Sequence, residues 1–373
     1  MHVLFLLSSL AMGGAERNVV SVLPYFQNEG IKVSLCTLNK RRDSPLVEDF
    51  LNTNIPRYNL GARRMVDYSS WIRFTSLLDD EKVDVVHAED QDSILYAGTV
   101  YDRRQMPVIM TRHVLEEPAS ALKSLLRSKM VLWTAKNRMN RVIAVSEAVR
   151  NLFSQQANIP TSKISTIYNG IDLQKFQNLS EKSEIRKKLG WHPSKPTAIL
   201  VSVLRPGKGI EIACDAVKKV LTIIPDFQLK IVGSGELEGE LKNYAANLYP
   251  SVEFLGQRMD IPNLMNASDL LIQSSWSEAL PTVLIEAGAA SLPVIATRVG
   301  GTEEIVQDGV SGYLINAGDV EALSETIIRL CSTPQLQVEM GEAALSIVSR
   351  NFSLATQAKK TITVYEDMLR HIR

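Results

Sequence analysis

Residues 270–286 read LLIQSSWSEALPTVLIE, a short apolar run followed by a polar loop and the start of a helix. The run Leu270–Gln273 is apolar throughout, as expected of a strand that is covered on both faces of its sheet. Pro281 marks the helix start, because proline suits the first helical position, where an N–H would have no partner. A strand, a loop and a helix in this order are typical of a parallel α/β sheet.

Two glutamates, Glu278 and Glu286, flank Pro281 and are separated by seven residues. Glu278 falls in the loop, and Glu286 falls in the second turn of the predicted helix. A helix N-terminus attracts phosphate. With a carboxylate on either side, the segment suits a sugar–diphosphate–ribose ligand. Glutamates near a helix start are also common without a ligand, so the spacing alone leaves both interpretations open.

Short apolar runs alternate with helical patterns along all 373 residues, which is enough chain for two domains with separate cores. The first series of predicted strands is Val3–Leu7, Val33–Leu38, Val83–His87, Val108–Thr111, Val142–Val145 and Ile164–Ile167. The second series is Ala198–Val203, Leu229–Val232, Val252–Leu255, Leu270–Gln273, Val294–Ala296 and Gly312–Ile315. Strands separated by helices predict two parallel, doubly wound, Rossmann-like sheets with right-handed crossovers.

A polar, lysine-rich segment near Asn178–Lys195 separates the two series. We therefore predict an N-terminal, acceptor-side domain at residues 1–178 and a C-terminal domain at 179–351. The final helix, within 352–373, is expected to pack back on the N-terminal domain. Because ligands bind outside the carboxyl ends of strands in such sheets, we expect the two domains to face each other across a ligand cleft.

Composition sets further bounds on function. The formal net charge is +0, so nothing global favours nucleic acid as a partner. No run approaches the roughly 20 apolar residues of a membrane-spanning helix. The opening MHVLFLLSSLAMGG reads better as a buried strand than as a signal peptide. Cys36, Cys214 and Cys331 lie in separate apolar stretches, which predicts buried free thiols in a reducing compartment. We expect a cytoplasmic protein.

Further motifs lie in the predicted strands or in the segments after them. They are Gly13–Arg17, Asp84–His87, Val142–Ala148, Tyr168–Asp172, Leu204–Gly209, Val232–Gly235, Phe254–Gly256, Ser277–Pro281, Glu286–Ala287 and Thr297–Gly301. Together and in this order, they make the chain resemble, over nearly its whole length, a retaining glycosyltransferase of the family 4 type. That family has the two-domain GT-B fold. The resemblance therefore implies an enzyme that uses a nucleoside-diphosphate sugar as its donor.

The resemblance also implies roles for residues of the C-terminal domain. Glu286 would accept hydrogen bonds from the ribose hydroxyls, and Glu278 would hold hydroxyls of the donor sugar. Backbone N–H groups near Leu280, Thr282 and Val283 would meet the diphosphate at the helix N-terminus. These residues would form the donor site.

Lys208 would supply positive charge to the departing diphosphate, in place of a metal ion, and would act mainly in the transition state. A solvated lysine in a Pro-Gly turn is the alternative. The family usually has an arginine five residues earlier, where this chain has Val203. Arg205, in the same loop, either takes over the phosphate contact or points to solvent. Ala279 replaces the usual glycine after Glu278, which narrows the approach to the sugar.

Other candidates depend more strongly on the resemblance. Gly13 and Gly14 follow a strand, and glycines let a backbone approach the diphosphate or the acceptor closely. The alternative is that the two glycines only form a backbone turn between the strand and the helix and contact no ligand. His113 closes a strand, where family members place a histidine beside the donor sugar, although a histidine at a strand end is more often packed or solvent-exposed. Arg258 stands where the family's backbone meets the base.

We predict no metal and no cofactor besides the donor substrate. Asp90-Gln91-Asp92 has the Asp-x-Asp spacing, but it follows a strand of the N-terminal domain, away from the expected diphosphate. Retention of anomeric configuration is implied by the resemblance. The sequence offers no obvious nucleophile, which fits a mechanism in which the leaving diphosphate helps to deprotonate the acceptor.

The segment Ala121–Arg141 bears on the acceptor. It contains basic residues and no acid, with apolar residues at roughly helical spacing. A basic amphipathic helix can lie on an anionic membrane surface, which would bring the enzyme to a lipid-linked sugar at the inner face of the membrane. The other interpretation is a helix that packs its apolar side on the sheet and exposes a solvated basic side.

Three functions therefore remain. The leading one is a metal-independent retaining transferase that moves a hexose-type sugar from a nucleoside diphosphate to a glycan or lipid-linked glycan. The second is a nucleotide-sugar epimerase of the same fold, although no convincing acid/base carboxylate pair is found for it in the first domain. The third is a non-catalytic partner subunit that keeps the nucleotide site.

Overall fold

The computed structural model describes residues 1–10, 13–39, 46–62, 67–102, 106–115, 122–177 and 179–372. The chain divides into two compact units. The first is Met1–Gly170 together with Leu354–Arg373, and the second is Ile171–Ser353. The sequence-based division instead placed its boundaries after residues 178 and 351, and Asn178 lies outside the described residues.

The first unit is built on a seven-stranded sheet with strand order β3-β2-β1-β4-β5-β6-β7. All neighbouring strands are parallel. The strands are β1 (His2–Leu7), β2 (Lys32–Thr37), β3 (Arg57–Asn59), β4 (Val85–Ala88), β5 (Val108–Arg112), β6 (Arg141–Ala144) and β7 (Ile164–Thr166). The predicted strands of this half are confirmed, with small shifts at their ends. Strand β3 was missed, because it is a short polar strand at the sheet edge.

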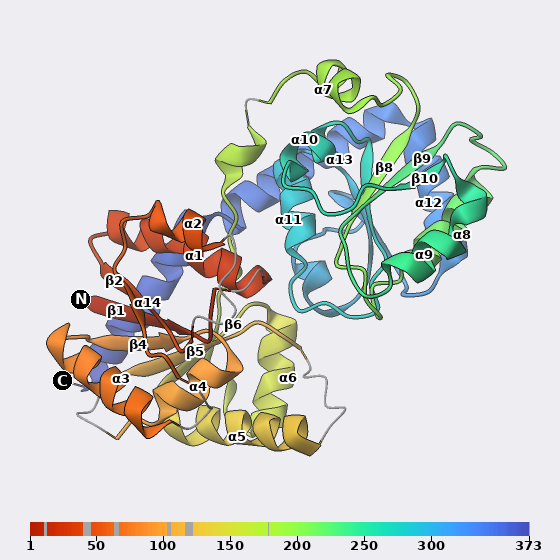
Figure 1. The fold of residues 1–373 in the computed structure, drawn as a ribbon. Coiled ribbons are helices and arrows are strands. Elements are labelled where there is room, and N and C mark those ends of the chain that lie inside the picture. Colours follow the sequence, from red (N-terminus) through yellow and green to blue (C-terminus); the bar gives the residue numbers. More distant parts are fainter. Residues whose placement is uncertain are drawn as a thin grey trace. The chain divides into compact units, whose positions relative to one another are not determined.

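Helices complete the first unit. They are α1 (Gly14–Asn28), α2 (Leu46–Leu51), α3 (Tyr68–Asp80), α4 (Gln91–Gly98), α5 (Leu122–Arg138), α6 (Glu147–Ala157) and α14 (Leu354–Ile372), with the 3-10 turn η1 (Thr161–Lys163). The last helix, α14, lies beside α1 and the strands of this unit (Figure 1). Tyr365 of α14 is fully buried, and the centroid of its ring lies 6.1 Å from that of the Phe26 ring of α1, with the two rings tilted by 31°. This packing brings the end of the chain into the core of the first unit.

The second unit has a six-stranded parallel sheet with strand order β10-β9-β8-β11-β12-β13. The strands are β8 (Thr197–Val201), β9 (Gln228–Val232), β10 (Val252–Phe254), β11 (Leu270–Gln273), β12 (Val294–Thr297) and β13 (Gly312–Ile315). The helices are α7 (Lys182–Leu189), α8 (Ile210–Val220), α9 (Glu238–Tyr244), α10 (Ile261–Asn266), α11 (Thr282–Ala289), α12 (Val320–Ser332) and α13 (Pro334–Asn351). The 3-10 turns are η2 (Leu173–Phe176), η3 (Ala246–Leu248) and η4 (Gly300–Glu304). The predicted strands of this half are confirmed.

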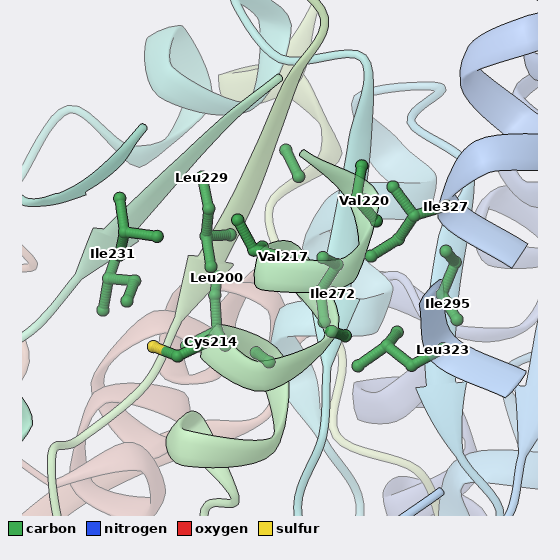
Figure 2. Packing of buried hydrophobic residues seen from close by; sticks show 14 of the residues in the cluster. Leu200, Cys214, Val217, Val220, Leu229, Ile231, Ile272, Ile295, Leu323 and Ile327 are labelled. Carbon is green, nitrogen blue, oxygen red and sulfur yellow. The ribbon is translucent and has the colours of Figure 1, made fainter. Parts of the chain in front are cut away.

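The core of the second unit lies between its sheet and helices α8 and α12. Alternate strand residues point to the same side of a sheet, and Figure 2 shows how this brings apolar side chains together. The residues labelled there are Leu200, Cys214, Val217, Val220, Leu229, Ile231, Ile272, Ile295, Leu323 and Ile327. Each large apolar side chain buried in this way contributes about 1.5–3 kcal/mol relative to exposure. The core therefore holds the strand ends, and the loops after them, in place.

Both sheets reverse their strand order beside their first strand. In the first unit β1 lies between β2 and β4, and in the second unit β8 lies between β9 and β11. Open α/β sheets bind ligands outside the carboxyl ends of the strands at such a switch point. The topology therefore singles out the loops after β1 and β4, and the loops after β8 and β11.

Candidate functional site

A pocket of about 230 Å³ lies at the switch point of the second unit. Its walls are the ends of β8 and β11, the loops that follow them and the first residues of α11. Val203, Arg205 and Lys208 come from the loop after β8, and Glu278 comes from the loop after β11. The structure thus brings together side chains that are far apart in the sequence.

The loops after β8 and β11 are tied to each other. Gly209 precedes α8 with φ +60°, and a Cβ there would lie 2.1 Å from the carbonyl oxygen of Ser274, so only glycine fits. The Ser274 hydroxyl donates to the Gly209 carbonyl at 2.7 Å. The Trp276 N–H donates to the Gly207 carbonyl at 2.9 Å. These contacts fix the backbone from which Lys208 projects.

Lys208 and Glu278 form an ion pair inside the pocket. Lys208 Nζ lies 2.6 Å from Glu278 Oε1, and each side chain is 15% exposed. The Ser275 hydroxyl donates to the same oxygen at 2.7 Å, and Gln273 Nε2 lies 3.3 Å from it. Among the described residues all these contacts use Oε1, which leaves Oε2 to accept a hydrogen bond from a ligand. One pocket therefore offers both a cation and a carboxylate acceptor.

Gln273 and Thr297 hold the groups that contact Glu278, and no motif in the sequence marks either residue as part of the site. Gln273 is buried at the end of β11 and accepts from the Thr297 N–H at 3.2 Å. The Thr297 hydroxyl donates to the Ser275 carbonyl at 2.6 Å. These bonds turn the Gln273 amide so that its NH₂ faces Glu278. A glutamine ending an apolar strand was the one signal available in the sequence.

Helix α11 presents its N-terminus to the pocket. The first helical residue is Thr282. Pro281 stands directly before it, with φ −74° and ψ 96°, outside the helical range. The predicted start at Pro281 is therefore shifted by one residue. The first amides of a helix have no acceptor inside it, and Leu280, Thr282 and Val283 line the pocket. Such a helix end favours an anion.

The remaining donor-site candidates are placed differently. Arg205 is exposed, and both it and Val203, which is 57% exposed, line the pocket. Glu286 is partly exposed in the second turn of α11 and does not belong to the pocket lining. Arg258 also lies outside that lining. Its Nε donates to Asp260 at 2.8 Å, and its Nη2 donates to the same carboxylate at 2.6 Å.

In the first unit, Gly13 and Gly14 stand at the start of α1. A Cβ on Gly13 would lie 2.0 Å from Oε2 of Glu16, which is the end of a flexible side chain that can move away. A Cβ on Gly14 would meet no atom within 4 Å. Burial raises the pKa of Glu16. The space around these two positions therefore does not by itself require glycine, and Gly14 is exposed.

His113 follows β5 and is paired with a buried carboxylate. Its Nε2 lies 2.8 Å from Oε2 of Glu89, whose side chain is 5% exposed. Glu89 directly follows β4, so both residues stand at carboxyl ends of neighbouring strands. His113 was predicted from the sequence as a site residue, and Glu89 was not.

The Asp-x-Asp segment has protein partners. Asp90 accepts from the Ser8 N–H and the Ser8 hydroxyl at 2.5 Å each, and it caps α4 by accepting from the Ser93 N–H at 3.0 Å. Asp92 pairs with Arg127 of α5. These aspartates tie β1, α4 and α5 together.

Helix α5 covers most of the predicted basic segment. Ala121 lies outside the described residues, and Arg141 belongs to β6. The side chains of Val131, Ala135 and Met139 are buried. The exposed residues include both large apolar and basic side chains, namely Leu125, Leu126, Lys129, Met130, Trp133 and Lys136. Arg127 and Arg138 pair with acids of the same unit. No helix in the described part of the chain is long and apolar enough to cross a membrane.

Comparison with known proteins agrees with this fold. The family model "Glycosyltransferase Family 4" matches residues 12–175, and "Glycosyl transferases group 1" matches residues 181–346. HepE of Anabaena, solved in complex with UDP and glucose, has a TM-score of 0.86 at 23% identity and covers 98% of this chain and 100% of that chain. The fold is GT-B, as predicted. The chain belongs to the family 4-like glycosyltransferases, and it is a glycosyltransferase.

Curated relatives carry more specific names. The chain is 26% identical over 371 residues to an Escherichia coli UDP-Gal:alpha-D-GlcNAc-diphosphoundecaprenol alpha-1,3-galactosyltransferase, covering 96% of this chain and 95% of that protein. It is 32% identical over 231 residues to the N-acetyl-alpha-D-glucosaminyl L-malate synthase of Bacillus anthracis, covering 61% of this chain and 60% of that protein.

Proposed function

We propose that this glycosyltransferase moves a hexose-type sugar from a nucleoside-diphosphate sugar to a glycan or lipid-linked glycan, with retention of configuration and without a metal ion. The observation that carries the proposal is the Lys208–Glu278 pair, which lies in the same pocket as the first residues of α11. A cation, a carboxylate and a helix N-terminus together match a sugar attached to a diphosphate.

The diphosphate would lie at the amides of Thr282 and Val283, with Lys208 beside it. As the bond between the sugar C1 and the diphosphate breaks, negative charge develops on the leaving oxygen, and a fixed cation stabilises that charge most in the transition state. Lys208 supplies this charge from the protein, which supports the proposal that no metal is required. Arg205, which lines the same pocket, would add a second phosphate contact.

Glu278 would hold the sugar through Oε2, the oxygen that its protein contacts leave available. Glu286 would accept from the ribose hydroxyls, and the backbone beside Arg258 would meet the base. Retention is proposed from family membership. The acceptor oxygen would bond to C1 on the face that the diphosphate leaves, and its proton would pass to the leaving phosphate oxygen.

The acceptor would be presented at the first unit near Gly14, and His113 would lie beside the donor sugar. The Escherichia coli relative is named for a diphosphoundecaprenol-linked substrate. The mixed apolar and basic exposed side of α5 fits an anionic bilayer surface, since Trp133 and Leu126 are 56% and 54% exposed beside Lys129 and Lys136. We therefore propose a cytoplasmic enzyme that contacts the inner face of the membrane through α5.

A scan of UDP-, GDP- and ADP-sugars tests the proposal. A bound donor should raise the melting temperature, because a ligand of the folded state stabilises it by RT ln(1 + [L]/Kd). The same donor should release its nucleoside diphosphate at an equal rate with and without EDTA. Release that stops in EDTA and returns with Mg²⁺ or Mn²⁺ would contradict metal independence. An isomerised donor would indicate an epimerase instead, and binding with neither release nor transfer to any acceptor would indicate a partner subunit.

A further inference from the structure

Glu278 has more hydrogen-bond donors on one oxygen than that oxygen needs. Its Oε1 lies 2.6 Å from Lys208 Nζ, 2.7 Å from the Ser275 hydroxyl and 3.3 Å from Gln273 Nε2. A carboxylate has about four lone-pair sites, which is about two on each oxygen. The hydroxyl and the amide are therefore enough to satisfy Oε1, and the lysine is an additional donor.

Lys208 has the opposite imbalance. Its ammonium group carries three N–H donors. Among the described residues, Glu278 is the one acceptor within hydrogen-bond distance of Nζ. The side chain is only 15% exposed, as is that of Glu278. Two N–H groups of a largely buried lysine can therefore take a further acceptor, such as a phosphate oxygen.

The backbone of β12 fixes which end of the Gln273 side chain faces Glu278. The Thr297 N–H lies 3.2 Å from Gln273 Oε1, and a backbone N–H can only donate. The Thr297 hydroxyl donates to the Ser275 carbonyl at 2.6 Å. The side chains of Gln273, Ser275 and Thr297 are all buried. The sheet thus holds both donors to Glu278, and their positions do not depend on Lys208.

This arrangement changes the cost of breaking the ion pair. Removing one partner of a buried ion pair is ordinarily strongly destabilising, because the remaining charge is left uncompensated. Without the lysine, Glu278 would keep two hydrogen bonds on Oε1, and hydrogen bonds to an ionised acceptor are among the stronger ones. Lys208 has a flexible four-carbon stem and lines the same pocket as Thr282 at the start of α11. The lysine can therefore turn from Glu278 to an anion in the pocket.

We propose that Ser275 and Gln273 are positioning residues that keep Glu278 ionised and hydrogen-bonded on their own, so that Lys208 can exchange Glu278 for the diphosphate of the donor. The exchange with the diphosphate rests on the proposed function. The positioning of Glu278 rests on contacts within the second unit alone. The carboxylate that would hold the sugar thereby stays fixed while the cation moves to the leaving group.

The test is a double-mutant cycle on the full chain, made of the wild type, Lys208→Met, Ser275→Ala and the variant with both changes. At pH 7.5, Lys208→Met should lower the urea midpoint more in Ser275→Ala than in the wild type, because Glu278 then keeps one donor instead of two. At pH 5 this extra loss should be smaller, because a buried carboxylate with too few donors takes up a proton. A loss that came from packing alone would be the same at both pH values.

Ser324→Ala is the matched control. Ser324 is a buried serine of α12 whose hydroxyl donates to the Glu321 carbonyl, and it does not line the pocket. Lys208→Met should cost the same in this variant as in the wild type. The positioning role would be overturned if Lys208→Met cost the same in Ser275→Ala as in the wild type at pH 7.5. An extra loss as large at pH 5 as at pH 7.5 would overturn it as well.

Gln273→Glu tests the second donor independently. It keeps an oxygen that accepts from Thr297 and replaces the amide NH₂ by a carboxylate oxygen beside Glu278. Two carboxylates at such a distance disfavour each other's ionisation, so the variant should lose more stability relative to the wild type at pH 7.5 than at pH 5. Gln335→Glu makes the same change at an exposed glutamine whose Nε2 donates to Glu339 at 3.0 Å, and its pH effect should be much smaller. Equal pH effects in the two variants would show that Gln273 does not donate to Glu278.

The four proteins of the cycle also test the exchange, with UDP, GDP and ADP as probes, since a free diphosphate carries the charge that the leaving group develops. For a probe that binds the wild type, Ser275→Ala should weaken the affinity by about twofold to tenfold, in line with the loss of one hydrogen bond. The reason is that Glu278 then holds Lys208 more firmly, so the loss should be absent in Lys208→Met.

A loss of affinity that persists without the lysine would show that Ser275 contacts the ligand directly, and it would overturn the exchange. If none of the three probes bound the wild type, the proposed function and the exchange would both fail. The urea midpoints, which need no ligand, would still decide the positioning role of Ser275 and Gln273.

Discussion

Both units place a glutamate after the strand that follows their first strand in the sheet, Glu89 after β4 and Glu278 after β11, but the surroundings of the two glutamates differ. In the second unit, Lys208 and Glu278 border a pocket of about 230 Å³. In the first unit, Glu89 and His113 stand at the strand ends beside a cavity of about 10 Å³. The strand order around each switch point is the same. Topology therefore decides where a site can lie, and the side chains at the strand ends decide the size and charge of the cavity beside them.

This difference assigns different tasks to the two pairs. Lys208 and Glu278 are reached by a ligand, so replacing either should change binding or turnover directly. Glu89 has a 5% exposed side chain and is paired with His113 inside the first unit. Its replacement should remove a buried contact of that unit.

The largest effect is expected for Lys208→Ala. Removing a group that stabilises charge in the transition state costs about 10²–10³-fold in turnover at comparable sites. The variant should therefore lose kcat by that order, while the affinity for the donor falls much less. Steady-state kinetics of nucleoside diphosphate release, with donor binding measured separately, checks both quantities.

A matched control is Lys218→Ala, which removes an exposed lysine from α8 in the same unit. Its kinetics should equal those of the wild type. If Lys208→Ala weakened donor binding and turnover by the same factor, the lysine would serve ground-state binding, and its role toward the leaving group would be wrong.

The smallest effect concerns the first unit and its stability. The pKa of His87 is lower in the folded protein than in the unfolded chain, because the ring is buried. Below about pH 6.5 the unfolded chain binds the extra proton, so the free energy of unfolding falls as the pH falls, by up to about 1.4 kcal/mol per pH unit. Urea titrations between pH 7.5 and 5 should show a flatter slope for His87→Gln than for the wild type.

The second unit supplies the control for this slope. Its histidine, His192, is exposed, so His192→Gln should keep the wild-type slope. Burial also lowers the pKa of His2 in the first unit, so part of the slope should survive in His87→Gln. Equal slopes in all three proteins would show that His87 takes up its proton in the folded state as readily as in the unfolded chain.

The strands were predictable because buried parallel strands are apolar runs between turn signals. Leu270–Gln273 and Gly312–Ile315 end where the pattern placed them. Arg57–Asn59 escaped prediction because an edge strand of three residues has no apolar run to reveal it. The start of α11 shifted by one residue because a proline fits the position before a helix as well as its first turn.

Single residues of the site could be predicted from the sequence, but the contacts between them could not. Lys208 and Glu278 were selected separately, and their ion pair joins positions 70 residues apart. The contacts of His87 and Glu89 were missed because their partners come from another strand, from the residue after it and from the last helix. Tyr365 lies 278 residues after His87, and no local pattern in the sequence links them. Long-range side-chain contacts of this kind depend on tertiary packing, which periodicity does not report.

The measurement that tests the central claim most directly is a calorimetric titration of the nucleoside diphosphate released in the donor scan. It is made on the wild type, on Glu286→Ala and on Glu325→Ala, which removes an exposed glutamate from α12 as a control. The account predicts that Glu286→Ala weakens the affinity by about tenfold or more. The ribose hydroxyls lose their charged acceptor, and a hydrogen bond to a charged group is worth about 1.5–3 kcal/mol. Glu325→Ala should bind as the wild type does. Equal affinity in all three proteins would contradict the placement of the donor nucleotide on α11.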